Sequence, residues 1–519
     1  MTSYGYFDDA NREYVITDPK TPVKWVNYVG TLQFGGIVDH TGGSLICKGD
    51  PALNRIVKYI PQLPSSDFKG ETLYLRVKTS NGYKVFSPFY VPTLDVYDRY
   101  ECHVGLSYQK IVSEFYGIRT EVTIFVPMGS NVVLRDISIT NISGKSMEVD
   151  VIPVVEYSHF DALKQFTNAD WVPQTMIVDA VKEKEGTVIH KQYAFMKRDT
   201  AVNYFTSNVS VDSFETDRKS FLGNNEYGTW KQPLSLFSEH LSNHEARRAD
   251  NMSALLHCLG TVKSGEIRRL ITQLGQEESL DKALESIKHY RDEKNVDRAF
   301  SQLKDFWTEY LSTLQVSTPD ASFNSMVNIH NPRQCHTTKN WSRDLSLYQL
   351  GFGGRGMGFR DSSQDVMGVM AHMSGEGRDL LEKILSVQKA DGSAMHQFYA
   401  STLEANEGDS REEHGHKFYG DDHLWAILAV CAYLKETGEL SFLDKRISFY
   451  DKELPVSQRE TGTVLDHLQR ALAFTQENKG QHGLPLLGFA DWNDTVNLKG
   501  NAESLFVANQ YARALVEII

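Results

Sequence analysis

Cysteine is scarce in this chain of 519 residues, which contains only five. Disulfide frameworks and zinc modules use cysteines in even numbers or at short, repeated spacings. The five here are odd in number, widely spaced and without a Cys-x-x-Cys pair: Cys47, Cys102, Cys258, Cys335 and Cys431. We therefore expect isolated thiols in a reducing, cytoplasmic compartment.

Long apolar runs are also missing. No stretch approaches the roughly 18 apolar residues that a membrane-spanning helix needs. The first residues, MTSYGYFDDANREY, are acidic where a secretory signal peptide has a basic segment followed by an apolar one. We expect neither a membrane segment nor a secretory signal.

Positive charge is in deficit, because 67 Asp and Glu residues outnumber 54 Lys and Arg residues and give a formal net charge of -13. A negative surface repels nucleic acid and anionic membranes, so we expect neither as a partner. Any phosphate site must then be a local arginine pocket. It is not a P-loop, since Gly-x-x-x-x-Gly-Lys-Ser/Thr does not occur.

The residues that are present follow two periodicities, and the length alone suggests at least two domains. Up to about residue 275, apolar residues alternate with polar ones, as in 119–126 and 132–141, between turns rich in Gly, Pro and Asn. This pattern predicts an antiparallel β-sandwich over residues 1–275, with 253–262 and 265–274 as its final hairpin.

Helical periodicity begins after the sandwich. It predicts one helix over 279–292 and a second from Asn295, taken as its N-cap, to Leu314. We assign these residues a structural role, in a helical linker over 276–318.

Residues 319–519 alternate helices with long polar loops, a pattern that favours a helical toroid. The predicted helices are 363–373, 377–389, 422–436, 463–478 and 503–519. A closed toroid of six helix pairs needs more helices than these, and the last one runs to the end of the sequence without a cap. We expect an incomplete barrel from a longer enzyme, and we expect these 519 residues alone to be inactive and prone to aggregate.

Two glycine-framed polar segments, 353–365 and 488–498, carry the side chains of a sugar site. Arg355 and Asp361 can bond hydroxyls, and Trp492 offers a flat face to a pyranose ring. Asp494, beside an apolar wall, is the candidate proton donor. Asp491 is the alternative donor, and either aspartate could instead cap a helix or form a turn.

Arginine also supplies a candidate anion site. Arg343 and Arg355 flank a largely apolar stretch, and a guanidinium presents a planar fork of donors to phosphate or to paired hydroxyls. A solvated surface arginine is the alternative for each of them taken alone.

A histidine cluster invites a metal interpretation, which we reject. His414 and His416 lie two residues apart in a charged stretch, which favours solvent exposure over zinc ligation. We interpret Asp421, Asp422 and Trp425 as substrate-loop residues or as the N-terminal cap of the following helix.

Several ordered motifs resemble those of the disaccharide phosphorylases of glycoside hydrolase family 94, which include the cellobiose and chitobiose phosphorylases. They extend along almost the whole chain: YGYFD (4–8), REYVIT (12–17), WVNYVG (25–30), GLSY (105–108), FVP (125–127), GMGFRDS (356–362), QD (364–365), DGS (391–393) and ADWND (490–494).

The resemblance implies a supersandwich domain, a helical linker and an (α/α)6 barrel. It also implies inverting phosphorolysis of a β-linked disaccharide, with inorganic phosphate as co-substrate and without a cofactor or metal. By position, Asp494 resembles the general acid, and Trp492 resembles the residue that stacks near the scissile bond. Arg355 and Asp361 resemble sugar-binding residues, and Arg343 resembles a phosphate ligand. The resemblance further implies a homodimer.

Local sequence around 356–365 and 391–396 favours cellobiose as substrate, with laminaribiose, cellobionic acid and chitobiose as alternatives. Two other functions stay open. One is an inverting hydrolase on the same barrel, which needs a second carboxylate to activate water. The other is a carbohydrate-binding fragment without turnover.

Overall fold

The computed structural model describes residues 4–61, 63–168, 170–195, 201–248, 250–341, 345, 356–399, 402–408 and 417–519. These residues form two compact units, which divide between Thr308 and Glu309, with Leu345 belonging to the first. The predicted domain boundaries at residues 275 and 318 stay predictions.

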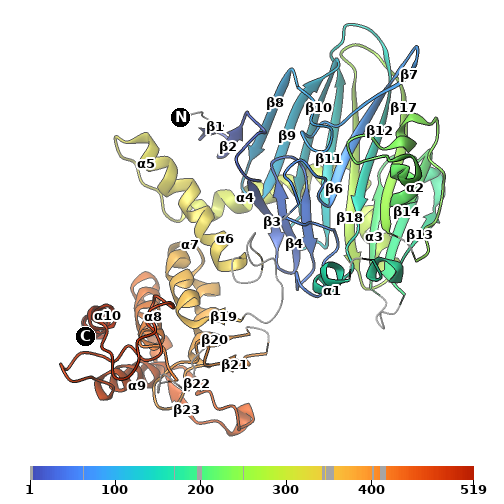
Figure 1. Cartoon of the computed structure of the whole chain (residues 1–519). Helices are drawn as coiled ribbons and strands as arrows, with labels where there is room; N and C mark the ends of the chain where they lie inside the picture. Colours follow the sequence, from blue (N-terminus) through green and yellow to red (C-terminus); the bar gives the residue numbers. More distant parts are fainter. Residues whose placement is uncertain are drawn as a thin grey trace. The chain divides into compact units, whose positions relative to one another are not determined.

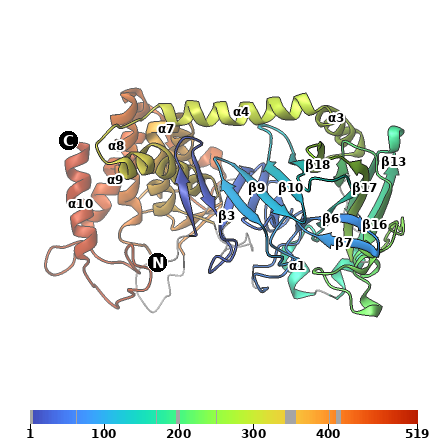
Figure 2. The same cartoon turned by 90° about the horizontal axis from the view of Figure 1, so that it is seen from above.

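The first unit is a β-sandwich (Figures 1 and 2). Its strands are β1 (Gly5–Asp8), β2 (Glu13–Ile16), β3 (Val26–Thr31), β4 (Phe34–Asp39), β5 (Ser44–Cys47), β6 (Glu71–Thr79), β7 (Gly82–Phe86), β8 (Arg99–Val104), β9 (Tyr108–Phe115), β10 (Ile118–Phe125), β11 (Val132–Asn141), β12 (Met147–Glu156), β13 (Met176–Lys182), β14 (Val188–Ala194), β15 (Val202–Ser207), β16 (Ser213–Asp217), β17 (Asn251–Val262) and β18 (Ile267–Glu277). The short helices α1 (Ala162–Thr167) and α2 (Arg218–Leu222) interrupt them.

Two antiparallel sheets make up the sandwich within the described residues. The larger has the strand order β1-β2-β8-β9-β10-β11-β18-β15-β14-β13, and the smaller has the order β16-β17-β12-β6-β7. Strands β3, β4 and β5 form a separate three-stranded sheet. The prediction of an antiparallel sandwich is thus confirmed.

Alternation of apolar and polar residues explains how the sheets meet. In β10 the side chains of Val122 and Ile124 are fully buried, whereas Glu121 and Thr123, which alternate with them, are half-buried. The buried side chains of β10 and β11 belong to one apolar core with Leu75 of β6 and with buried valines of β12. The core therefore lies between the two sheets, as a period of two requires.

The final hairpin of the sandwich is predicted wrongly. Strand β17 pairs with β12 and β16 in the smaller sheet, whereas β18 pairs with β11 and β15 in the larger one. The two strands are consecutive in sequence and each is amphipathic, but the chain crosses from one sheet to the other between them. Periodicity cannot distinguish a hairpin from such a crossing.

Two helices follow the last strand. α3 (Leu280–Tyr290) is capped by Ser279, whose hydroxyl accepts from the amide of Lys282. α4 (Glu293–Ser312) starts two residues before Asn295, so the predicted N-cap is wrong. Asn295 instead lies in the first turn, where its side-chain amide donates to the carbonyl of His289 at 2.9 Å.

The second unit is helical in its described part. Its helices are α5 (Ala321–Ser325), α6 (Asn331–Trp341), α7 (Phe359–Leu385), α8 (Asp422–Thr437), α9 (Val464–Glu477) and α10 (Leu505–Ile518). The short strands are β19 (Met357–Gly358), β20 (Gln397–Phe398), β21 (Ala405–Asn406), β22 (Arg446–Ser448) and β23 (Thr461–Thr463). Buried side chains of α7, α8, α9 and α10 form one core. The closed six-pair toroid stays a prediction.

Helix α7 replaces two predicted helices, because the chain runs helically from Phe359 to Leu385 with one non-helical residue, Met373. That break falls at the predicted end of the first helix. Helix α6 is absent from the prediction, since its only buried side chains are Pro332, Thr337 and Trp341 and its sequence is otherwise polar. Weak amphipathicity left no periodic signal to find.

The five cysteines form no disulfide within the described residues. In the same residues, no helix combines the length and the apolar character needed to cross a membrane.

Candidate active site

The candidate site is built around the first turn of α7. Strand β19 runs directly into this helix and pairs with β20, which pairs with β21. The amide of Phe359 donates to the carbonyl of His396 at 2.9 Å. The small sheet therefore holds the residue before β20 against the beginning of α7.

The segment that carries Asp491 to Asp494 is held by backbone pairing with the residues before α8. The amide of Gly420 donates to the carbonyls of Leu487, at 3.1 Å, and of Ala490, at 2.9 Å. Gly488 has φ of +69°, and a Cβ there would lie 2.3 Å from the carbonyl oxygen of Phe418. Glycine is needed because the backbone is left-handed and the segment before α8 passes so close.

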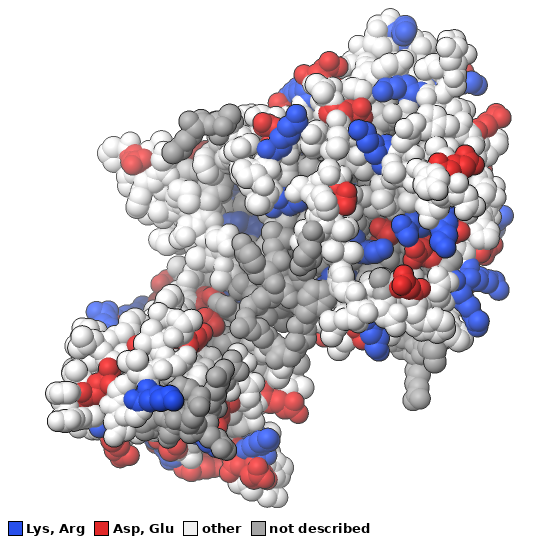
Figure 3. Space-filling view, viewed as in Figure 1, with Lys and Arg blue, Asp and Glu red and all other residues white. Residues whose placement is uncertain are grey.

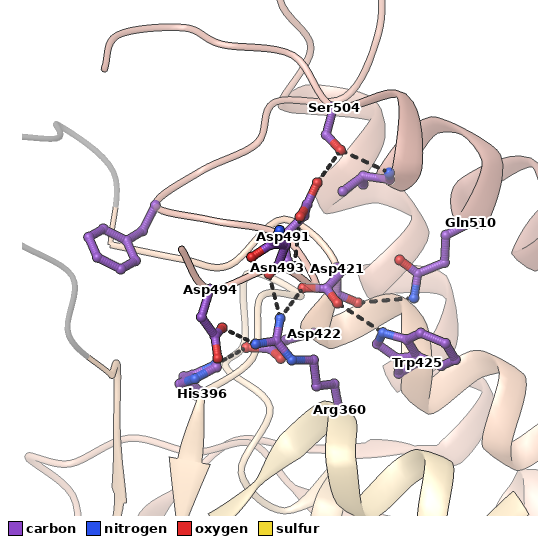
Figure 4. Close-up of polar contacts among 12 residues, drawn as sticks. Arg360, His396, Asp421, Asp422, Trp425, Asp491, Asn493, Asp494, Ser504 and Gln510 are labelled. Atoms are coloured by element: carbon purple, nitrogen blue, oxygen red, sulfur yellow. Dashed lines mark hydrogen bonds and ion pairs between the residues drawn. The ribbon is translucent and has the colours of Figure 1, made fainter. Parts of the chain in front are cut away.

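Arg360, in the first turn of α7, joins these parts (Figure 4). Its guanidinium donates through Nη1 to Oδ1 of Asp421 at 3.0 Å and to the carbonyl of Asp491 at 2.6 Å. Through Nη2 it contacts the carboxylate of Asp494. Burial alone would lower the pKa of Arg360, but Asp421, Asp422 and Asp494 raise it overall. Arg360 therefore stays charged and links α7, α8 and the loop.

Asp421 and Asp422 place two buried carboxylates at the start of α8. Asp421 occupies the N-cap position but makes no capping bond among the described residues. Its Oδ2 instead accepts from Nε1 of Trp425 at 2.9 Å. Burial and the charge of Asp422 raise the pKa of Asp421, and burial raises the pKa of Asp422 as well. The pair therefore favours holding a proton.

His396 extends this cluster. Its Nδ1 lies 2.9 Å from Oδ2 of Asp422, and its ring stacks on Tyr419 with centroids 3.6 Å apart. Burial opposes the charged imidazolium, but the charge of Asp422 raises the pKa of His396 overall. Oδ1 of Asp422 is buried and has no hydrogen-bond partner among the described residues. Behind the loop lies a polar cluster built from two carboxylates, an imidazole and a guanidinium.

The structure brings several predicted site residues together. Asp494 and Trp492 lie on the loop, and Trp492 is 55% exposed. Asp361 is half-buried in the first turn of α7, and its charge contributes to the raised pKa of Asp422. Arg343 and Arg355 lie outside the described residues, as do His414 and His416.

The predicted apolar wall around Asp494 is wrong. Its side chain is 60% exposed and ion-paired with Arg360. The apolar residues near it in sequence point elsewhere: Leu487, Phe489 and Ala490 are buried. These three residues, which precede the aspartates, are buried, whereas the Asp494 carboxylate stays at the surface.

Asp491, the alternative acid, has a structural role here. Its Oδ1 accepts from the amide of Asn493 at 3.0 Å and its Oδ2 accepts from the hydroxyl of Ser504 at 2.6 Å. Ser504 also caps α10 by accepting from the amide of Val507. Asp491 thus ties the loop to the beginning of α10, as the turn interpretation required.

Three residues of this cluster were not predicted: Arg360, His396 and Tyr419. Arg360 precedes the predicted site residue Asp361 at the start of a helix. A charged residue in front of an apolar helix face was therefore the one signal in the sequence that could have pointed to it. His396 and Tyr419 carried none, because their roles depend on neighbours distant in sequence. No group of three His, Cys, Asp or Glu side chains in the described residues is arranged to hold a metal ion.

Chemically, the arrangement offers a carboxylate at the surface, that of Asp494, which a buried cation holds in place. Few other acidic side chains follow it along the loop. A half-exposed indole two residues away offers a flat apolar face, as sugar rings require. These features suit proton transfer at a carbohydrate.

Comparison with known proteins agrees with this chemistry. Residues 12–293 match the glycosyl hydrolase 94 supersandwich domain, and residues 306–519 match the glycosyl hydrolase 94 superfamily catalytic domain. The chain is 31% identical to an N,N'-diacetylchitobiose phosphorylase of Vibrio proteolyticus, over 99% of this chain and 64% of that protein. It is 26% identical to a solabiose phosphorylase of Paenibacillus borealis, over 100% of this chain and 63% of that protein.

The chain thus spans a little under two thirds of the length of these relatives. Both domain matches, which together extend from residue 12 to residue 519, are to a single family. The chain belongs to glycosyl hydrolase family 94.

Proposed function

We propose that the protein carrying this chain catalyses inverting phosphorolysis of a β-linked disaccharide, giving an α-sugar 1-phosphate and a free sugar. The observation that carries the proposal is the surface carboxylate of Asp494, held by buried Arg360 on the loop that also bears Trp492. Membership of family 94 and the phosphorylase names of the relatives support it.

In the proposed reaction, Asp494 gives its proton to the glycosidic oxygen as the bond to the anomeric carbon breaks. An oxygen of phosphate attacks that carbon from the opposite face, so the configuration inverts. An inverting hydrolase needs a second carboxylate to activate water, whereas phosphate is already a nucleophile. Because a proton donor must be protonated, the ion pair of Asp494 with Arg360 has to open when substrate binds.

The other predicted side chains complete the proposal. Asp361 and Arg355 bind hydroxyls of the sugar that becomes phosphorylated, and Trp492 stacks on it. Arg343 contributes to phosphate binding, and neither cofactor nor metal takes part. The (α/α)6 barrel, the homodimer and the cytoplasmic location belong to the proposal as well.

Cellobiose is the substrate that the local sequence favours, and the relatives offer a direct competitor. Two proteins from Vibrio that are 31% identical to this chain are named as N,N'-diacetylchitobiose phosphorylases. The two disaccharides differ at C2, where one has a hydroxyl and the other an acetamido group. The substrate is therefore decided by which group the site accepts at C2 of the sugar, the hydroxyl or the acetamido group.

The test is to incubate the full-length protein with cellobiose, N,N'-diacetylchitobiose, laminaribiose and cellobionic acid, each with and without inorganic phosphate. We expect sugar 1-phosphate and free sugar from one of them, only when phosphate is present. Release of sugar at a comparable rate in phosphate-free buffer would establish the hydrolase instead. Binding without any turnover would leave a carbohydrate-binding protein.

A further inference from the structure

The sandwich unit has a cavity of about 400 Å³ that the proposed reaction does not use. Every residue that lines it belongs to the sandwich, between Lys58 and Lys231. Its volume falls in the range of small-molecule sites, about 300–1,000 Å³. We refer to it as the sandwich cavity.

One wall of the sandwich cavity is aromatic and apolar. Trp230 lies against Phe68, with ring centroids 4.3 Å apart and planes 33° from parallel. Phe68 is buried and Trp230 is half-buried. The hydroxyl of Tyr74 donates to the carbonyl of Trp230, which fixes the backbone at this point. Leu63, 40% exposed, continues the apolar lining. A partly exposed indole on a rigid support is a stacking surface for a ring.

Another part of the lining is charged. Nζ of Lys58 lies 3.0 Å from Oε1 of Glu156, and Nε of Arg218 lies 3.9 Å from the same oxygen. Arg218 also pairs with Asp250 at 2.6 Å. Both ion pairs of Glu156 use its Oε1 atom, so Oε2 takes part in neither ion pair. Carboxylates and cations that alternate in this way can accept from and donate to neighbouring hydroxyls.

The charges around the sandwich cavity cancel. Its lining contains the cations Lys58, Arg218 and Lys231 and the carboxylates of Asp67 and Glu156, and the ion pair of Asp250 with Arg218 supplies a third carboxylate. Figure 3 shows the same interleaving of basic and acidic side chains over the part of the sandwich that carries α2. An anionic ligand would have to displace existing ion pairs, so the cavity favours a neutral one.

A small recess next to the sandwich cavity provides a second polar feature. It shares Lys58 and Glu156 with the cavity and is also lined by Asn251. Asn251 is 5% exposed, and both polar atoms of its side chain lack a partner among the described residues. The recess has room for about one water molecule. Such a water can extend the polar floor of the cavity toward Asn251.

We propose that the sandwich cavity is a non-catalytic site for a neutral saccharide. A pyranose ring stacks its apolar face on Trp230, and its hydroxyls bond Lys58, Glu156 and Arg218. By volume the cavity accepts roughly one or two such rings. The ligand is a mono- or disaccharide, or the end of a longer chain, without phosphate. This proposal does not depend on the proposed catalytic function.

The test is calorimetric titration of the full chain with cellobiose, N,N'-diacetylchitobiose and glucose 1-phosphate, all in a Trp492→Ala background that removes the indole of the candidate active site. Trp230→Ala removes the stacking surface. Thr229→Trp fills the cavity with a side chain placed at an exposed position. It tests whether the cavity binds the sugar even if Trp230→Ala does not fold. Trp171→Ala is the matched control, since Trp171 is 65% exposed on the same unit and does not line the cavity.

We expect at least one neutral disaccharide to bind the background protein. Trp230→Ala and Thr229→Trp should each weaken that binding at least tenfold, whereas Trp171→Ala should leave it within twofold. Absence of binding in the Trp492→Ala background would overturn the proposal, as would unchanged binding in a folded Thr229→Trp protein. Tenfold tighter binding of glucose 1-phosphate than of the neutral sugars, if Thr229→Trp abolishes it, would show that the ligand class is wrong.

Discussion

Arg360 is 4% exposed, yet it contacts a carboxylate whose own side chain is 60% exposed. A buried cation costs solvation, and here carboxylates and a carbonyl from two other segments surround it and offset that cost. The consequence for Asp494 is a defined position at the surface. One arginine thus converts an exposed loop residue into a fixed group.

At this scale the first prediction concerns Asp494. Asp494→Asn should lower turnover of the full-length enzyme by about two to four orders of magnitude, since the amide cannot give a proton. Asp491→Asn should lower it far less, because Asp491 serves the loop and α10 through hydrogen bonds. Steady-state rates in the presence of phosphate, with circular dichroism to check folding, measure both. Loss of activity in Asp491→Asn alone would show that the assignment is reversed.

The second prediction concerns His190 in β14. Its ring is fully buried, and neither ring nitrogen has a hydrogen-bond partner among the described residues. Burial lowers the pKa of His190 to about 3. The histidine is therefore neutral in the folded state, while the unfolded chain takes up a proton below about pH 6.5. Stability that is present above that pH is lost as the pH falls toward 3.

Between pH 7 and pH 5 this group should cost about 2 kcal/mol of unfolding free energy. His190→Leu should remove that part of the acid sensitivity, and His240→Leu, at an exposed position, should not. Urea unfolding of the sandwich transition at the two pH values provides the measurement. A His190→Leu protein as acid-sensitive as the wild type would contradict the prediction.

Among the elements, the loop before α10 depends on a glycine, Gly488. Its pairing with the segment before α8 brings the Phe418 carbonyl so near Gly488 that no side chain fits. Gly483 also has positive φ, at +75°, but an added Cβ there meets nothing within 4 Å. Both glycines have a left-handed backbone but differ in the space around an added Cβ, so Gly483 serves as the control for Gly488.

Alanine at either glycine should cost about 1–2 kcal/mol for the left-handed backbone. Gly488→Ala should cost measurably more, because the methyl group meets a carbonyl oxygen, and it should also reduce activity by shifting Asp494. Chemical unfolding of the helical unit and turnover of the full-length enzyme test both parts. Equal losses of stability in the two variants would mean that the close approach to Phe418 is not maintained.

The helices illustrate which elements periodicity can predict. Helix α8 was predicted over 422–436 and occupies Asp422–Thr437, since its apolar residues and the glycine after it mark both ends. Helix α6 has only three buried side chains and gave no such pattern. Tertiary packing, rather than amphipathicity, keeps α6 helical.

For the whole molecule, each compact unit has a core of its own. The sandwich core contains Leu75 of β6, and the core of the helical unit contains Leu424 of α8, both with fully buried side chains. Removing a buried leucine side chain costs about 2–5 kcal/mol. Since the two cores share no residue, the cost should fall on one unit at a time.

Leu75→Ala should lower one thermal transition of the chain, and Leu424→Ala should lower a different one. Differential scanning calorimetry of the two variants and the wild type measures this directly, and each variant is the control for the other. A single transition lowered equally by both substitutions would show that the units unfold as one.

Alternation, helical spacing and the order of short motifs were enough to find the antiparallel sandwich, most of the helices and the family, because these signals lie among neighbours along the chain. The prediction that β17 and β18 form a hairpin was wrong, because the strands that each of them pairs with are not its neighbours along the chain. Arg360 reaches Asp421 and Asp494 across 61 and 134 residues, and no local pattern records such a contact. The burial of Arg360 and the pairing of Asp494 follow from folding, since the chain must first bring α7, α8 and the loop together before their charges can interact.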